Sequence, residues 1–250
     1  MRIKNNKKIE FFLKNFFFSK KYLFEKRIKR AIKEKEEHEI EILKELIIKD
    51  TDTIDVGVYR GVHSYEMSKY SNKVHAFEPN PVIYKDLENY LLKIKSNIKL
   101  YNYALSNVEG IKNLKIPLRN SKINKDNYEE YYKMGLASIH ESNTFSAYET
   151  FQVKSIKLDN INIDNKISLI KIDVEGHELE VINGGIKLIN KYKPNLIIEI
   201  EERHSKRKVM ETINTISEIG YKVFVYNKYI KEIKTEKNLD KFNNFIFKAN

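Results

Sequence analysis

Hydrophobic residues follow two alternating periods along most of the chain. From residue 51 onward, short apolar runs are followed by segments whose apolar residues recur at spacings of three and four. The first pattern is typical of buried strands and the second of amphipathic helices. The predicted strands cover 53–56, 73–77, 98–104, 168–173, 195–200, 221–226 and 243–248, and the predicted helices cover 62–69, 82–95, 177–191 and 205–219.

This alternation predicts an α/β fold. Strands separated by helices pair in parallel through right-handed crossovers. The segment between the last two strands has no clear helical pattern, which favours an antiparallel final strand. We therefore expect a mostly parallel, seven-stranded sheet with an antiparallel last strand.

Residues 107–157 interrupt this rhythm. The apolar positions at 108–111 and 114–117 predict a hairpin, and 120–133 is polar and rich in tyrosine. Segments this long inside a compact domain usually act as lids or binding loops. We expect this insert, within a domain spanning 51–250, to determine which substrate is bound.

The first 50 residues predict a helical extension that is basic and amphipathic. Apolar residues recur with helical spacing over 9–32, and a second helix is predicted over 34–48. Residues 1–35 hold 13 Lys or Arg and 3 Glu, whereas the rest of the chain is nearly neutral. The apolar stripe predicts packing on the domain or on a second subunit of a homodimer. The alternatives are an anionic membrane surface, a partner enzyme or nucleic acid.

Composition limits the chemistry. The chain has no cysteine, which excludes disulfides, thiolate metal sites and cysteine nucleophiles. No apolar run is long enough for a membrane span, and the first residues do not resemble a signal peptide. We expect a cytoplasmic protein, with the basic helix as a means of peripheral attachment to the inner face of a membrane.

Three predicted strands end in acidic residues: Asp55, Glu78 and Asp173. The carboxyl ends of parallel strands form the crevice in which open α/β folds bind ligands. Gly57 and Gly61 allow a tight backbone turn after the first strand, and a carboxylate such as Glu78 can accept both hydroxyls of a ribose. The G-x-G-x-x-G spacing of a dinucleotide site is absent. The pattern therefore favours a nucleoside cofactor without a pyrophosphate, such as S-adenosylmethionine.

Four motifs resemble the FkbM family of methyltransferases. They are Asp-Val-Gly-x-x-x-Gly-x-x-Ser (55–64), Phe-Glu-Pro-Asn-Pro (77–81), Ala-Leu-Ser (104–106) and Ile-Lys-Ile-Asp-Val-Glu-Gly-His-Glu (170–178), with a further small-residue segment at 135–138. The resemblance covers about residues 51–202 and implies a class I, Rossmann-like methyltransferase that uses S-adenosylmethionine. The family usually has Ala-Asn where this chain has Val58-Tyr59. The predicted cofactor contacts are Asp55, Gly57, Tyr59, Gly61, Ser64, Glu78, Asn80, Asn102 and Ala104.

Methyl transfer to a hydroxyl needs a base, or a metal that acidifies the hydroxyl. Asp173 is the predicted base, and Lys171, on the same strand face, is predicted to hold its carboxylate ionised. His177, at the start of the next helix, is a second candidate for the base or for a substrate contact. The alternatives are that Asp173 caps that helix, that Lys171 forms only a buried ion pair, and that His177 is solvated.

A second hypothesis places a hard divalent metal ion on Asp173, Glu199 and His204, where two neighbouring strands end in acids. His140, after the long segment, is a weaker candidate of the same kind. The alternative is that the carboxylates bind the substrate directly.

The resemblance implies an O-methyltransferase acting on a sugar hydroxyl, with a nucleotide-activated or lipid-linked sugar as substrate in surface polysaccharide biosynthesis. An RNA methyltransferase with a basic arm is a second hypothesis, and a non-catalytic module that recruits partners is a third. The predicted fourth strand lacks the Asn/Asp-Pro-Pro-aromatic motif that acts on base amino groups. We therefore do not expect a nucleic-acid partner.

Overall fold

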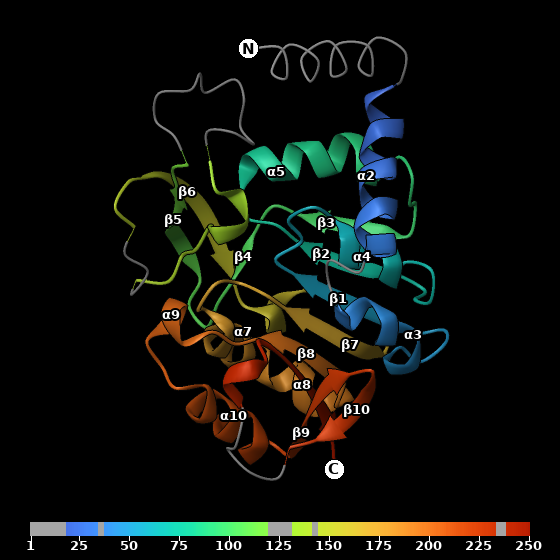
Figure 1. The fold of residues 1–250 in the computed structure, drawn as a ribbon, viewed down its shortest axis with the longest axis vertical. Helices are drawn as coiled ribbons and strands as arrows, with labels where there is room; N and C mark the ends of the chain where they lie inside the picture. The colour runs from blue at the N-terminus through green and yellow to red at the C-terminus, as the bar shows by residue number, and fades with distance from the viewer. Residues whose placement is uncertain (1–18, 35–37, 120–131, 142–144, 234–238) are drawn as a thin grey trace.

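The computed structural model describes residues 19–34, 38–119, 132–141, 145–233 and 239–250. They form an eight-stranded sheet with helices on both faces and a three-stranded sheet at one side (Figure 1). In spatial order, the strands of the larger sheet are β10 (Tyr229–Glu232), β9 (Tyr221–Asn227), β11 (Asn244–Ala249), β8 (Asn195–Glu199), β7 (Ile167–Ile172), β1 (Asp52–Val56), β2 (Val74–Phe77) and β3 (Ile98–Tyr101).

The sheet confirms the predicted fold class. Strands β8, β7, β1, β2 and β3 pair in parallel, and β11 runs antiparallel to both β8 and β9. The eighth strand, β10, was not predicted. It pairs antiparallel with β9 after a turn at Lys228, whose φ is +63°.

The central strands are apolar because both of their faces are covered. All five residues of β1 and all six of β7 are buried. Alternate side chains enter different layers: Ile170 and Ile172 join one hydrophobic cluster, and Leu169 joins the cluster on the opposite face. This arrangement fixes the register of the strand ends that carry the polar residues.

Helices connect the parallel strands. The helices that connect strands of the larger sheet are α4 (Val62–Met67), α5 (Pro81–Asp86) with its π-helical continuation η2 (Leu87–Leu91), α7 (Glu178–Gly184), α8 (Ile186–Tyr192), α9 (Glu202–Ser205) and α10 (Val209–Glu218). The start of α5 is fixed by Asn80, whose side chain accepts a hydrogen bond from the Val82 backbone N–H at 3.0 Å. The single helix predicted over 177–191 is instead divided at Gly185.

The insert contains a sheet instead of the predicted hairpin. Strand β5 (Gly110–Pro117) runs without a turn and pairs antiparallel with β6 (Tyr148–Ile156), while β4 (Ala104–Leu105) pairs in parallel with β6. The partner of β5 is therefore distant in sequence, and Ala104 belongs to this second sheet instead of to β3. Short 3-10 turns lie at η3 (Met134–Leu136), η4 (Leu158–Asn160) and η5 (Leu239–Lys241). Residues 120–131 of the insert lie outside the described residues.

The described part of the N-terminal extension comprises α2 (Lys20–Glu34), η1 (His38–Ile42) and α3 (Leu43–Leu46). Ile28 and Ala31 of α2 are buried where this helix meets α4 and η2, and the Phe24 ring lies 5.6 Å from that of Tyr90. The basic helix thus packs its apolar face on the domain. The stripe predicted before residue 19 lies outside the described residues, among which no helix is long and apolar enough to cross a membrane.

Candidate active site

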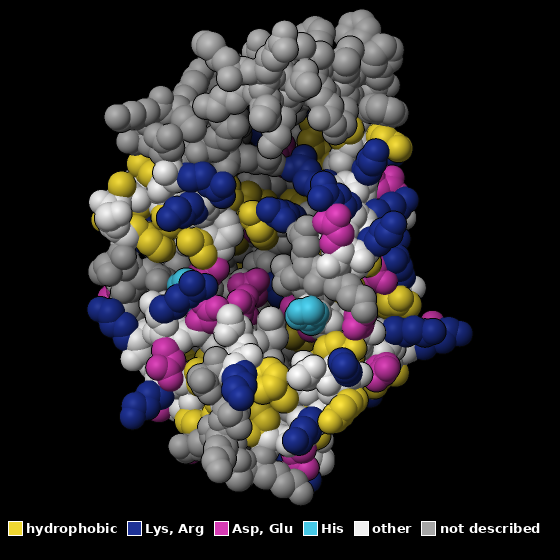
Figure 2. Space-filling model, viewed as in Figure 1, with side chains coloured by type: hydrophobic (Ala, Val, Ile, Leu, Met, Phe, Trp, Pro, Cys, Tyr) yellow, Lys and Arg dark blue, Asp and Glu magenta, His cyan; other side chains and the backbone are white. Residues whose placement is uncertain are grey.

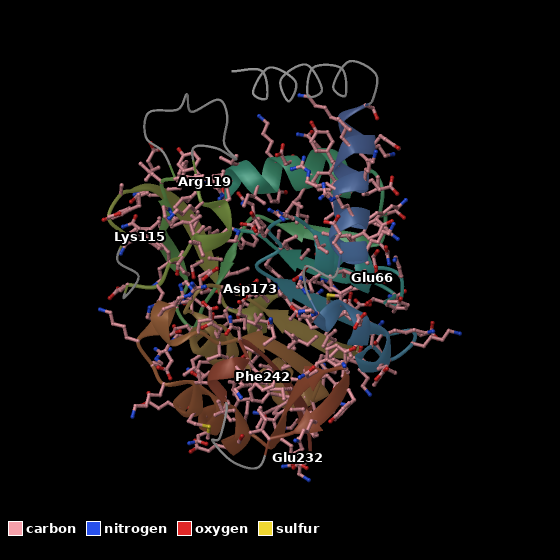
Figure 3. All side chains as sticks on the ribbon, in the orientation of Figure 1. Glu66, Lys115, Arg119, Asp173, Glu232 and Phe242 are labelled. Atoms are coloured by element: carbon pink, nitrogen blue, oxygen red, sulfur yellow. The ribbon has the colours of Figure 1, made fainter. Side chains whose placement is uncertain are left out.

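The carboxyl ends of β1, β2 and β7 meet at one cleft, as the topology predicts. Gly57, Glu78 and Asp173 line it from these three strand ends, and Ala104 and His177 line it from β4 and the start of α7. Figure 2 shows acidic side chains gathered in a hollow near the centre of this face, with Lys and Arg side chains above them. Asp173 lies near the middle of the molecule in Figure 3.

Glu78 is a buried carboxyl group held by two loops. Its Oε2 accepts a hydrogen bond from the Tyr59 backbone N–H at 2.8 Å, and its Oε1 accepts one from the Asn80 N–H at 2.8 Å. The side chain is 5% exposed, and this burial raises the pKa of Glu78 to about 7 despite the two hydrogen bonds. The group therefore changes charge near neutral pH.

The loop after β1 is tightly packed. A Cβ added to Gly57, whose φ is +83°, would lie 1.8 Å from the carbonyl oxygen of Asp173, so this position has room only for glycine. Tyr59 also has positive φ, at +47°, and Glu175 in the facing loop has φ +55°. Such strained backbone is concentrated at functional sites. The cleft is narrow here, because a Cβ on Gly135 would lie 3.3 Å from the Tyr59 ring.

Of the nine predicted cofactor contacts, Gly57, Tyr59, Glu78 and Ala104 line the cleft. The others support its walls. Ser64 donates a 2.5 Å hydrogen bond to Asp55 Oδ2, and Gly61 begins α4 with φ +77°. Asn80 caps α5, and the Asn102 side chain donates to the Glu78 carbonyl oxygen at 2.8 Å. Asn102 therefore fixes the loop that carries Glu78.

Lys171, Asp173 and Glu199 form one charged cluster. Lys171 Nζ donates to Asp173 Oδ2 at 3.0 Å; the lysine is 3% exposed, and the Asp173 side chain is 30% exposed toward the cleft. Burial alone would raise the pKa of Asp173, but the Lys171 ammonium holds it below its ordinary value. Burial and the neighbouring Asp173 charge raise the pKa of Glu199 to about 9, so Glu199 is protonated and hydrogen-bonded to ionised Asp173.

His177 is buried in the wall of the cleft and does not lie in solvent. Its Nε2 lies 2.9 Å from Ser106 Oγ, and its Nδ1 lies 3.7 Å from Glu180 Oε2. Burial lowers the pKa of His177 to about 4, so the ring is neutral at physiological pH. His177 is the N-cap residue of α7, so the alternative in which Asp173 caps this helix is wrong.

The predicted metal set is only partly brought together: Asp173 and Glu199 are neighbours, but His204 binds other carboxylates. His204 Nε2 lies 2.8 Å from both Glu175 Oε2 and Glu201 Oε2, because the short helix α9 directs it toward these residues. Among the described residues, the set with ligand atoms within 4.8 Å of one another is instead His140, His177 and Glu180. The sequence carried one signal for Glu180: it follows His177 by three residues, on the same helix face.

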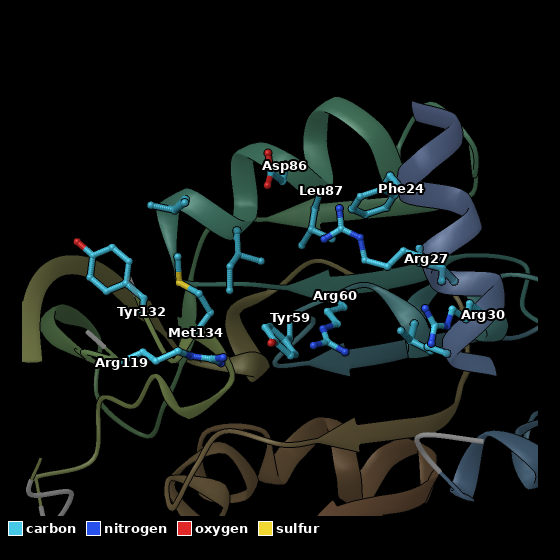
Figure 4. Close-up of a pocket in the computed structure, with 15 residues that line it drawn as sticks. Phe24, Arg27, Arg30, Tyr59, Arg60, Asp86, Leu87, Arg119, Tyr132 and Met134 are labelled. Carbon is cyan, nitrogen blue, oxygen red and sulfur yellow. The ribbon is translucent and has the colours of Figure 1, made fainter. Parts of the chain in front are cut away.

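A second pocket adjoins the cleft and was not predicted. Its volume is about 570 Å³, and it shares Tyr59, Ile83 and Met134 with the cleft. Its described basic lining residues come from α2, the loop after β1 and the segment just after β5, and are Arg27, Arg30, Arg60 and Arg119; among the described lining residues, Asp86 is the acidic one. Figure 4 shows Arg27 and Arg119 extending into this pocket from opposite sides.

The protein-family model for the methyltransferase FkbM domain matches residues 55–223 of the sequence, which contain the three strand ends of the cleft. The chain belongs to this family. Methyltransferase FkbM from Methylobacillus flagellatus has a similar structure, with a TM-score of 0.51, 16% sequence identity, and coverage of 84% of this chain and 50% of that one. This chain thus spans half the length of that protein.

Two further solved structures are similar at lower TM-scores. An rRNA methylase from Streptococcus thermophilus has a TM-score of 0.45 and 13% identity, covering 85% of this chain and 94% of that one. A TehB-like S-adenosylmethionine-dependent methyltransferase from Corynebacterium glutamicum has a TM-score of 0.47 and 8% identity, covering 92% and 98%. No curated protein matches the chain.

The chain therefore contains a methyltransferase-family domain, and S-adenosylmethionine is the cofactor that its motifs predict. The residues of the cleft fit this molecule. Glu78 offers carboxylate oxygens to ribose hydroxyls, and Gly57 exposes bare backbone. Asp55 lies beneath the loop after β1: it is fully buried, does not line the cleft, and its Oδ1 has no hydrogen-bond partner among the described residues.

Proposed function

We propose that this methyltransferase acts on a hydroxyl of a sugar carried on a diphosphate, either a nucleotide or a lipid diphosphate. The arginine-lined pocket beside the cofactor cleft is the observation that carries this proposal. Activated sugars of this kind are building blocks of surface polysaccharides, and we assign the reaction to their biosynthesis.

Size and charge both favour a phosphate-bearing small molecule. A volume of about 570 Å³ suits a small-molecule ligand. Among the described lining residues, four are arginine and one, Asp86, is acidic, although Arg30 also pairs with Glu34 at 2.9 Å. Arginine matches phosphate oxygens with paired hydrogen bonds. The rings of Phe24, Tyr59 and Tyr132 supply apolar faces for a sugar or a base. Because Tyr59 belongs to both pockets, an acceptor held by the arginines reaches the cofactor cleft.

In this proposal Asp173 receives the proton of the acceptor hydroxyl. S-adenosylmethionine supplies the methyl group on a sulfonium, so the protein has to orient the acceptor and remove its proton. Asp173 is ionised and partly exposed to the cleft, which leaves lone pairs for the hydroxyl. Lys171 fixes the carboxylate with a 3.0 Å hydrogen bond and keeps it charged until the proton arrives. We assign Glu78 to the ribose hydroxyls.

The test is methyl transfer from labelled S-adenosylmethionine to nucleotide-diphosphate sugars, the same sugars without phosphate, and total RNA. We expect label in the diphosphate sugars. Arg27→Ala should raise the KM for such an acceptor about tenfold with little change in kcat, because it removes one charge-assisted hydrogen bond. Lys33→Ala is the matched control, since Lys33 is exposed on the same helix and does not line the pocket.

Three results would contradict the proposal. Label that appears in RNA and not in sugars would make the protein an RNA methyltransferase. Equal KM values for sugars with and without diphosphate would show that the arginines do not bind the diphosphate of the acceptor. An Arg27→Ala variant with the same KM as Lys33→Ala would do the same.

A further inference from the structure

One wall of the cofactor cleft carries a group of metal-ligating side chains that the proposed transfer does not use. His140, His177 and Glu180 each offer one ligand atom, and these atoms lie within 4.8 Å of one another. The rings of His140 and His177 meet edge to face, with centroids 5.8 Å apart. His177 and Glu180 lie one helical turn apart at the start of α7, and His140 comes from the segment after η3.

His177 has an unused nitrogen that points into this group. Its Nε2 is engaged with Ser106 Oγ at 2.9 Å, and its Nδ1 is buried without a hydrogen-bond partner among the described residues. The residue is only 7% exposed, so burying this nitrogen unpaired is unfavourable unless a ligand completes it. A hydrogen bond from one ring nitrogen that leaves the other bare is the usual arrangement of a metal-bound histidine.

The other two ligands are also held by neighbours. Arg207 binds Glu180 mainly through Oε1, at 2.5 Å, and its second contact, to Oε2, is 3.4 Å long. Oε2 is the oxygen that faces His177 Nδ1, at 3.7 Å. The backbone of His140 donates to Ser138 Oγ at 3.0 Å, and Ser138 in turn donates to the Glu175 carbonyl oxygen at 2.8 Å.

We propose that His140, His177 and Glu180 bind a zinc-class divalent ion at the wall of the cofactor cleft. Two imidazoles and one carboxylate suit Zn²⁺ better than the hard, oxygen-seeking ions that Asp173 and Glu199 would attract. In a tetrahedral zinc site the ligand atoms are about 3.3 Å apart, so the observed spacings need shifts of roughly 0.5–1.5 Å. His140 is half-buried on a loop and can supply most of that movement.

Three protein ligands leave a fourth position of the ion open, as in catalytic zinc sites. His177 and Ile139, the neighbour of His140, both line the cofactor cleft, so the ion lies next to the cavity that the acceptor hydroxyl has to reach for methyl transfer. We infer that it binds an acceptor oxygen and lowers the pKa of a hydroxyl. This role rests on the proposed O-methyl transfer, whereas the binding of the ion does not.

The test is metal binding by the full chain, freed of any histidine tag and of metal by chelation. Titration with Zn²⁺ by calorimetry, and with Co²⁺ by its visible absorption, should give one ion per chain with the intense bands of a tetrahedral site. His140→Ala and Glu180→Gln should each weaken binding at least tenfold, and Ser106→Ala roughly tenfold. His38→Ala is the control, because His38 is exposed and outside the group, and it should bind as the native protein does.

Absence of stoichiometric binding by the native chain, or unchanged binding by a folded His140→Ala variant, would overturn the site. Circular dichroism establishes that each variant is folded. These measurements do not depend on catalysis, so their outcome is separate from that of the acceptor assay. A protein that binds the ion and methylates equally well without it would overturn the role in acceptor binding and leave the site in place.

Discussion

The ionisation of Glu78 should couple the stability of the unliganded protein to pH. Burial raises the pKa of this carboxyl group from 4.5 to about 7. At about 1.4 kcal/mol for each pH unit, ionised Glu78 costs the folded protein about 3 kcal/mol. The folded state holds the proton more tightly than the unfolded chain. The stability that protonated Glu78 gives the folded protein is therefore fully present below pH 4.5 and is lost as the pH rises through about 7.

Glu78→Gln removes this titration. The amide oxygen replaces only one of the two acceptors that the Tyr59 and Asn80 N–H groups use, which costs about 1 kcal/mol at every pH. The stability of the native protein relative to the variant should therefore fall by about 2–3 kcal/mol between about pH 5 and about pH 8. Urea unfolding at both pH values measures this difference, with the exposed Glu218→Gln as control.

A native-to-variant difference that changes by less than about 0.5 kcal/mol over this range would refute the reasoning. The cofactor gives an independent check. If ribose hydroxyls donate to ionised Glu78, S-adenosylhomocysteine should bind up to about tenfold more tightly per pH unit as the pH rises toward 7, with release of a proton. Glu78→Gln should lose both the tight binding and its pH dependence.

Two substitutions test the packing beneath the cleft. Gly57→Ala should lower the thermal unfolding midpoint by much more than Gly110→Ala does. Both positions have positive φ, but of the two only a Cβ at 57 meets another atom, the Asp173 carbonyl oxygen. Equal shifts of the midpoint would contradict this close approach. Lys171→Met should destabilise the protein by about 3 kcal/mol, since it leaves the Asp173 carboxylate without its cation. The exposed Lys187→Met should stay within about 0.5 kcal/mol of the native protein in denaturant unfolding, and a Lys171→Met variant as stable as Lys187→Met would exclude the ion pair.

Strand ends were predictable from the sequence, because a buried strand has one register that satisfies its apolar residues. That register places Gly57, Glu78 and Asp173 in one cleft, where the structure has them. Loop side chains were not predictable in the same way. His204 follows its strand by only a few residues, yet α9 turns it toward Glu175 and away from the predicted metal set.

Long-range pairing was the other limit. The residues of β5 alternate in a pattern that fits a strand, but nothing local specifies β6 as their partner, some 30 residues further along the chain. The helical spacing over 9–32 likewise predicted a helix where α2 lies, but not that Arg27 and Arg30 would reach a pocket beside the cofactor cleft. Such contacts depend on tertiary packing that a single sequence does not display.

The arginine pocket is assembled from two separate parts of the chain. Arg27 and Arg30 lie on α2, upstream of the family domain that begins at residue 55, whereas Arg60 and Arg119 lie within that domain. Helix α2 packs through a small apolar face centred on Ile28 and Ala31. Under the proposed function, exchange of α2 would therefore alter acceptor choice while the methyl-donor side stays unchanged, and engineering toward a different acceptor should begin upstream of residue 55.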